Sequence, residues 1–529
     1  IASCAMVLSL TACTSDNKTV VDGQTTVTSN SAGGVAVFTP SDGITLNQQM
    51  PLNKWAKLVP DLTKALVDAG FKKGDINHTT SDSLDKQSRA IQDFVVDHLS
   101  NNTTDDSGIA IAPDNMTLLV APVVEADAST RQYGDYVSQN LSTNDVTDEG
   151  ATSDGESSED DSSKDDSSNT ESDSTASDEQ AQAVDRLVSS LKLAKESGMH
   201  VVLLGNSIEG YKPDAFVKFS DAQTIGKLQA EKMVSKLKLD KASKDNPKYI
   251  EVLLPYTAVD EKGNANDSTF AQEAFRGIWQ VLGSYYQKGV VESPSGTLDG
   301  KSTENDWQAV AYDAAKEGST AKVLDKRLAK TDGQSTLTRI DGIITMNDYI
   351  ASEVVKELDD LGYTGSAADI NPQITISGIV GNITGKKDLS RDAVPDPIKS
   401  PENDNANDSS SSDDDADKDT SASDKDRDSQ WPLVTGYGAY VSNIPSIVNG
   451  KQWMTGMEDR QTIATDIAQA CAKLNKDEAL NSMPSIRNSE VGGVKKIPTI
   501  SEPLLAVSAS NLKSALIDPG YISLADAGL

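Results

Sequence analysis

Residues 340–352 read Ile-Asp-Gly-Ile-Ile-Thr-Met-Asn-Asp-Tyr-Ile-Ala-Ser. The apolar run from Gly342 to Met346 predicts a buried strand, and a helix is predicted from Tyr349 to Leu361. Asn347-Asp348 stands between them, where a side-chain oxygen can cap the helix or bind a ligand. This short stretch therefore joins a strand, a polar loop and a helix, which is the repeating unit of a parallel sheet.

The same alternation runs through most of the chain. Other strands are predicted at 34–40, 109–112, 116–121, 200–204, 215–219, 249–254, 374–380 and 432–435. Other helices are predicted at 53–69, 83–99, 180–197, 222–237, 269–288, 307–317, 444–449 and 460–474. The end of the chain, which contains Pro498, Pro503 and Pro519, is expected to be irregular. These units are too many for one ordinary sheet, so we expect an α/β fold of two doubly wound parallel-sheet lobes.

The negative charge of the chain is concentrated in two segments. The net charge is −33 over 529 residues. Fourteen acidic residues and one lysine lie between Asp145 and Glu179, and eleven acidic and three basic residues lie between Glu402 and Asp428. Such segments cannot bury enough apolar surface to offset the entropy of ordering, so we expect 142–180 and 398–430 to be disordered insertions. No basic stripe suits a nucleic acid.

Catalytic, cofactor and metal motifs are missing from the sequence. The three histidines, His78, His98 and His200, form no HExxH pattern, and neither a GxSxG elbow nor a P-loop occurs. The acidic run 413–419 lacks the glycine of a calcium loop. Cys471 lies in a stretch with helical apolar spacing and is predicted to be a small buried residue. We therefore expect a non-enzymatic protein without a metal or cofactor.

The first residues resemble the end of a lipoprotein signal. An apolar run closes on Leu10-Thr11-Ala12-Cys13, in which small residues precede a cysteine that can carry a lipid. We expect 1–13 to be the end of a signal that begins before Ile1, and Cys13 to be lipidated. Residues 14–34 have little apolar content and read as a flexible tether. The protein is then expected outside the cytoplasm, held at a membrane surface.

Polar residues follow several predicted strands. In open α/β sheets ligands bind beyond the carboxyl ends of the strands. Carboxylates and amides bond hydroxyl groups there, and aromatic faces cover the apolar side of a sugar ring. Helix capping by the same Asn and Asp residues is an equally good interpretation of any one of them. The candidate ligand-binding residues at strand ends are Ser41, Asp42, Asn206, Asp221, Asn266, Asp267, Asn347, Asp348 and Tyr437.

Several stretches resemble one family. These stretches are Phe216–Lys236, 340–352, 434–439, 447–455, 498–500 and 516–521. They resemble the type I solute-binding proteins of bacterial ABC importers, and most closely the xylose-, ribose- and multiple-sugar-binding group. The resemblance covers about 35–529 outside the acidic segments. It implies two lobes joined by a hinge of three crossovers. It places 35–212 and 438–497 in lobe 1, and 213–437 and 498–529 in lobe 2.

The resemblance also carries over to single positions. Trp55 matches an aromatic residue of the family, Lys54 stands where an arginine is common, and Asp221, Asn347 and Asp348 match its polar residues. The chain departs from the family pattern in three places. Asn206-Ser207 replaces Asp-Arg, Ala222 replaces an asparagine, and Tyr437-Gly438 replaces Gln-Asp. Each lost charge-assisted hydrogen bond is worth about 1.5–3 kcal/mol, so the ligand can differ from that of the family.

The resemblance implies a lipid-anchored solute-binding protein. The protein would capture a small polar ligand, with a sugar as the first candidate, and deliver it to an ABC permease. It would act as a monomer on the surface of a Gram-positive cell. No nucleic-acid partner is implied. Two alternatives stay open: a ligand sensor for a membrane receptor or kinase, and a surface protein whose ligand site has been lost.

Overall fold

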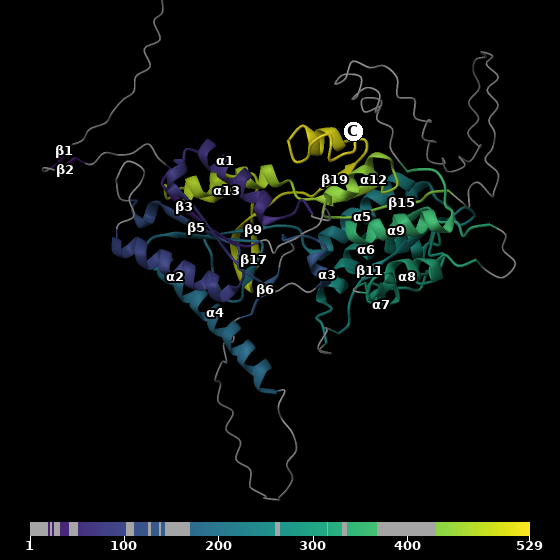
Figure 1. Cartoon of the computed structure of the whole chain (residues 1–529), viewed down its shortest axis with the longest axis horizontal. Coiled ribbons are helices and arrows are strands. Elements are labelled where there is room, and N and C mark those ends of the chain that lie inside the picture. Colours follow the sequence, from purple (N-terminus) through teal and green to yellow (C-terminus); the bar gives the residue numbers. More distant parts are fainter. Residues whose placement is uncertain are drawn as a thin grey trace, which may run out of the picture.

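The structure is a computed structural model that describes residues 20–21, 24–25, 32–41, 51–101, 111–124, 128–136, 139–142, 170–259, 265–314, 316–330, 336–367 and 430–529. Cys13, Asp42, the predicted strand 374–380 and most of both acidic segments lie outside these residues. The described residues form two lobes that lie side by side (Figure 1).

Lobe 1 is built on a seven-stranded sheet. Its strand order is β17 (Ile486–Val491), β18 (Val494–Ser501), β9 (Ala215–Lys218), β7 (His200–Leu204), β5 (Met116–Val120), β3 (Gly34–Pro40) and β4 (Ile76–Ser81). Every neighbouring pair is parallel except β17 with β18.

Helices cover both faces of this sheet, and the side chains of β3 show why. Val35 and Val37 pack with α1 (Trp55–Asp68) and α13 (Arg460–Leu474), whereas Ala36 and Phe38 pack with α2 (Leu84–Asn101) and α4 (Thr170–Glu196). Successive strand residues point to opposite faces, so an unbroken apolar strand needs a helix layer on each side. Cys471 lies buried in α13, as predicted.

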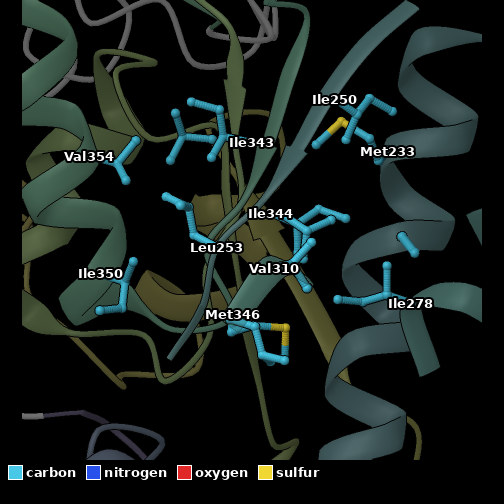
Figure 2. Close-up of a cluster of buried hydrophobic side chains, with 14 of the residues drawn as sticks. Met233, Ile250, Leu253, Ile278, Val310, Ile343, Ile344, Met346, Ile350 and Val354 are labelled. Atoms are coloured by element: carbon cyan, nitrogen blue, oxygen red, sulfur yellow. The ribbon is translucent and has the colours of Figure 1, made fainter. Parts of the chain in front are cut away.

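Lobe 2 has a smaller sheet of the same kind. Its order is β12 (Val291–Glu292), β10 (Lys248–Val252), β14 (Gly342–Ile344) and β15 (Leu433–Val434), and all pairs are parallel. Figure 2 shows Met233 of α5 (Ala222–Leu237) and Ile278 of α6 (Thr269–Gln287) on one side of the strands, and Val354 of α9 (Asp348–Leu361) on the other. Helix α8 (Ser319–Arg327) packs beside α9. The predicted fold of two doubly wound parallel-sheet lobes is therefore confirmed.

The remaining strands and α-helices of the described chain are short. They are β1 (Val20–Val21), β2 (Gln24–Thr25), α3 (Ala128–Arg131), β6 (Asn140–Leu141), β8 (Ser207–Ile208), β11 (Leu254–Pro255), α7 (Trp307–Val310), β13 (Ala311–Tyr312), α12 (Ile444–Val448), β16 (Met454–Met457) and β19 (Leu505–Ser508).

Three crossings join the lobes, at 219–221 between β9 and α5, at 458–459 between β16 and α13, and at 502–504 between β18 and β19. β16 belongs to the side of lobe 2, because Trp453 N–H donates to the Val434 carbonyl at 2.8 Å and Gly456 N–H to the Gly436 carbonyl at 2.9 Å. The three-crossover arrangement implied by the resemblance is present. The crossings differ from the boundaries taken from the sequence near 212, 437 and 497, since 215–218 and 498–501 pair within the lobe 1 sheet and 454–457 does not.

The prediction of an irregular ending is wrong for 486–508, whereas 509–529 consists mainly of turns. Residues 486–508 form β17, β18 and β19, and Pro498 lies inside β18. Proline cannot donate to a strand ladder. Pro498 is tolerated because the pairing of β18 with β9 begins only at the next residue, Thr499.

Other predictions need correction for similar reasons. The helix predicted at 307–317 ends at Val310, and β4 was not predicted because its residues Asn77 to Thr80 are polar and exposed. Helix α4 begins at Thr170, so the last part of segment 142–180 is helical, although Ser, Thr and Asp outnumber the helix-favouring Ala, Glu and Gln there. The predicted tether 14–34 includes the short pair β1 and β2, and its last residue begins β3.

Helices α5 and α6 approach each other closely at two glycines. A Cβ on Gly226 would lie 2.2 Å from the Ala274 carbonyl oxygen, and a Cβ on Gly277 would lie 2.0 Å from the Gln223 carbonyl oxygen. Because the obstacle is backbone in both cases, only a shift of one whole helix could relieve it.

Gly277→Ala is expected to lower the free energy of unfolding by about 1–3 kcal/mol, because overpacking costs that much in a well-packed core and outweighs the gain in helix propensity of roughly 0.5–1 kcal/mol. Urea titration followed by circular dichroism measures the change. Gly300→Ala is the matched control in the same lobe, since its Cβ would meet its nearest neighbour at 3.5 Å. Equal stability of the two variants would contradict the prediction.

Candidate functional site

Strand ends from both sheets lie at the interface between the lobes. β9 runs directly into the first crossing, and Asn347, which follows β14, hydrogen-bonds with Gln132 of lobe 1. Ligands of parallel α/β sheets bind beyond such carboxyl ends. The interface is therefore the candidate ligand site.

On the lobe 1 side, Lys54 and Trp55 are held by their own lobe. The Trp55 indole is 2% exposed and lies edge-on to the rings of Tyr136 and Phe219, with centroids 5.1 and 5.7 Å away. Lys54 Nζ forms an ion pair with Asp135 Oδ1 at 2.9 Å, and Asp135 Oδ2 accepts the Trp55 backbone N–H at 3.0 Å. These contacts fix the N-terminus of α1 at the edge of the interface.

Asn206 and Ser41 also connect loops within lobe 1. Asn206 Oδ1 accepts the Gln139 N–H at 3.0 Å, and its Nδ2 donates to the Pro122 carbonyl at 2.9 Å, so the buried amide joins the loops after β5 and β7. The Ser41 backbone N–H donates to the Ser81 carbonyl at 2.8 Å.

Three predicted residues of lobe 2 act in local structure. Asp221 caps α5 by accepting the Thr224 N–H at 2.7 Å. Asp267 accepts the Thr269 N–H at 2.9 Å in the first turn of α6. Asn266 Nδ2 donates to a backbone carbonyl of its own loop, that of Thr257, at 2.9 Å. The contacts of Asp221 and Asp267 agree with the capping interpretation that the sequence left open, whereas Asn266 stabilises its own loop.

Asn347 both caps a helix and reaches the other lobe. Its Oδ1 accepts the Ile350 N–H at 2.9 Å as the N-cap of α9, while its Nδ2 lies 3.1 Å from Gln132 Oε1 of lobe 1. The cap uses only the oxygen, so the amide nitrogen is the part of the side chain that faces the interface.

Asp348 is fully buried beside Asn347. Its carboxylate accepts the Tyr440 N–H at 2.9 Å, Gln452 Nε2 at 2.7 Å and Thr455 Oγ1 at 2.9 Å. Burial raises its pKa to about 6 despite these donors. The network holds the chain segments around 440 and 452–455 against the start of α9, which is a structural role.

A second buried carboxylate lies where two crossings meet. Glu458, in the second crossing, accepts the Ser220 N–H of the first crossing at 2.7 Å and also accepts the Ser220 hydroxyl. The Tyr437 hydroxyl lies 3.3 Å from the same oxygen, Oε1. Burial raises the pKa of Glu458 to about 7, and burial together with Glu458 raises the pKa of Tyr437. The predicted residue Tyr437 thus belongs to a hinge cluster of Ser220, Tyr437 and Glu458.

Glu458 and Ser220 are not among the residues predicted from the sequence. Glu458 stands in an acidic and basic run, Glu-Asp-Arg, ahead of a helix, a pattern typical of a solvated helix start. Nothing in that pattern indicates that the Glu458 side chain is buried. Its burial arises because the first and second crossings, which are distant in the sequence, lie side by side.

The segment 132–136 was also missed. Tyr133 is 1% exposed and packs in the hydrophobic core of lobe 2, although its segment leaves the sheet of lobe 1 after β5. Two tyrosines flanking a glycine, Tyr133-Gly134-Asp135-Tyr136, are the only signal that could have drawn attention to it.

Two further observations concern only the described residues. No group of three or more His, Cys, Asp or Glu side chains there could hold a metal ion. No helix among them has the length and apolar character needed to span a bilayer.

No protein-family model matches the sequence, and no curated protein matches it either. Solved structures similar to the chain are of the class that the sequence resembles. An ABC transporter solute-binding protein from Clostridium phytofermentans, solved with β-D-glucose, is 17% identical with a TM-score of 0.45, and the match covers 93% of this chain and 99% of that chain.

Two other similar structures have comparable scores. A carbohydrate transporter solute-binding protein from Chloroflexus aurantiacus, in complex with D-glucose, is 18% identical (TM-score 0.44, covering 94% of this chain and 98% of that one). An arabinose-binding protein from Geobacillus stearothermophilus is 10% identical (TM-score 0.41, covering 91% and 99%). At these identities and TM-scores the likeness assigns no ligand to this chain.

The hinge cluster predicts a specific pH dependence. The pKa of Glu458 is about 7 in the folded chain against an ordinary value of 4.5, so its protonation favours folding. This contribution is fully present below pH 4.5 and is lost as pH rises through about 7. Relative to Glu458→Gln, whose Oε1 can keep the same acceptor role, the wild type should lose roughly 3 kcal/mol of stability over that range.

Urea unfolding of both proteins across this pH range measures the difference. Glu490→Gln, at an exposed position of β17, serves as the control and should follow the wild-type profile. A difference between the wild type and Glu458→Gln that does not vary with pH would refute the assignment.

Proposed function

We propose that the protein captures a small polar ligand, a sugar, between its two lobes and delivers it to an ABC importer. The observation that carries the proposal is the architecture: two parallel-sheet lobes, with strand ends at their interface, are joined by three short crossings. Such crossings permit hinge closure around a ligand. The ligand class comes from the resemblance in the sequence.

The chemistry of the interface is suited to hydroxyl groups. Asn347 Nδ2 and Gln132 Oε1 pair with each other across the interface at 3.1 Å. When the lobes separate, this donor and this acceptor can bond to a polyol instead. The aromatic rings of Phe270 and Tyr437 lie close by, each in contact with the Tyr133 ring, and rings of this kind cover the apolar face of a sugar.

The proposed location rests on the N-terminal sequence. Lipid on Cys13 would hold the protein at the outer face of the cell membrane of a Gram-positive bacterium, near its permease. No step in this function requires covalent chemistry, so the proposal is a binding protein and not an enzyme.

The first test is a titration with D-glucose, D-ribose, D-xylose and L-arabinose by isothermal calorimetry. At least one sugar should bind saturably at one site. Asn347→Asp keeps the oxygen that caps α9 but loses the donor that a ligand hydroxyl would accept, a loss that outweighs the release of Gln132, so it should weaken binding about three- to tenfold. Asn305→Asp, at an exposed position of lobe 2, should bind like the wild type. If none of the sugars binds, or if Asn347→Asp binds as well as the wild type, the proposed site is wrong.

The second test concerns the anchor. Cys13→Ala should move the protein from the membrane fraction of its host cells to the medium without changing its affinity for a sugar, because a lipid needs the thiol. Cys4→Ala is the matched control and should change neither property. Persistence of Cys13→Ala in the membrane fraction would show that the anchor lies elsewhere.

A further inference from the structure

The segment Gln132 to Tyr136, called the strap here, is anchored to lobe 1 at its second half. The Tyr136 ring stacks on Phe219 at 4.7 Å with an interplanar angle of 21°. The Tyr136 hydroxyl donates to the Lys54 carbonyl. Asp135 pairs with Lys54, and its N–H donates to the Asn53 carbonyl at 2.8 Å. This half of the strap is therefore a fixed part of lobe 1.

The first half of the strap is held by lobe 2. The Tyr133 ring lies 4.7 Å from the ring of Phe270 and 6.3 Å from that of Tyr437. Gln132 Oε1 accepts Asn347 Nδ2 at 3.1 Å, and the Gln132 carbonyl accepts the Tyr440 hydroxyl at 2.7 Å. Two hydrogen bonds and two ring contacts thus tie neighbouring residues of one segment to the opposite lobe.

Gly134 makes this double attachment possible. It has a φ of +94°, and a Cβ at this position would lie 2.6 Å from the Asn53 carbonyl oxygen. A residue in the left-handed region turns the chain sharply. The turn sends the side chains on its two sides to different lobes, Tyr136 to lobe 1 and Tyr133 to lobe 2.

We propose that the strap is an internal latch that holds the two lobes closed when no ligand is bound. Tyr133 occupies the interface between Phe270 and Tyr437, and a ligand enters only after this ring has left. The latch is a property of the ligand-free chain and does not depend on which ligand the proposed function assigns. Its effect on affinity does rest on the proposed function, because a ligand that needs the open form binds in proportion to the open fraction.

The latch is tested by measuring the distance between the lobes in the ligand-free full chain. Spin labels on Asp360→Cys and Glu490→Cys, both exposed and in different lobes, report it by pulsed electron resonance. Cys4→Ser and Cys13→Ser remove the other reactive thiols, and Cys471 is buried. We expect one short distance in the wild type and an added longer distance in Tyr133→Ala.

Two controls separate the latch from a general loss of packing. Tyr133→Phe keeps the ring and should stay closed. Tyr363→Ala removes an equally buried ring at the other end of lobe 2 and should also stay closed. If Tyr133→Ala does not fold, Gln132→Ala, which removes only the contact with Asn347, should add a smaller open fraction. A folded Tyr133→Ala with the wild-type distance would overturn the latch.

The sugar titration distinguishes the latch from the proposed function. Any sugar that binds the wild type should bind Tyr133→Ala at least about tenfold tighter, since the open fraction rises. If no sugar binds either protein, the proposed ligand class fails, while the distance measurement still decides whether the latch exists. Equal sugar affinities in the two proteins would overturn the competition between Tyr133 and a ligand.

Discussion

The relation between the two lobes depends on one buried carboxylate. Glu458 lies in the second crossing and accepts both hydrogen bonds that Ser220 of the first crossing can donate. Its own N–H points to Asn53 Oδ1, at 3.4 Å, next to the N-terminus of α1. A buried acceptor without partners would be costly, so these donors keep the two crossings together. Two of the three covalent connections between the lobes therefore meet at this cluster.

The polar residues at the strand ends show how capping and recognition share one pattern. The side chains of Asp221 and Asp267 accept hydrogen bonds from nearby backbone N–H groups. Asn347 also accepts such a bond with its side-chain oxygen, but its amide nitrogen is directed at the other lobe. An asparagine has a donor and an acceptor whereas a carboxylate has only acceptors, so a capping asparagine keeps a group for an interface. The carboxylate of Asp348, one residue later, has only acceptors, and it uses them for the donors of a buried network.

The sequence predicts the layered lobes well because long apolar strands and amphipathic helices repeat. The bounds of α5, α13 and β7 agree with the prediction to the residue. Prediction from the sequence fails where a strand is stabilised by pairing with its neighbours and lacks an apolar pattern of its own. The examples are the polar edge strand β4 and the strand β18, which contains Pro498. The candidate site is predicted less well. The sequence pattern shows which side chains are polar. The positions of Glu458 and Tyr133, however, are set by contacts between segments that are distant along the chain.

A segment that fills the interface of its own protein has an advantage over any free molecule. Tyr133 is tethered a few residues from the lobe 1 contacts of Asp135 and Tyr136, so its insertion between Phe270 and Tyr437 costs little translational entropy. A free ligand loses that entropy on binding and must also separate the Gln132 pair with Asn347. Under the proposed function, a ligand has to make more contacts than the strap loses, which favours a ring with several hydroxyl groups over a small apolar one. A strap of this kind would raise selectivity at the expense of affinity, because weakly bonding molecules could not replace it.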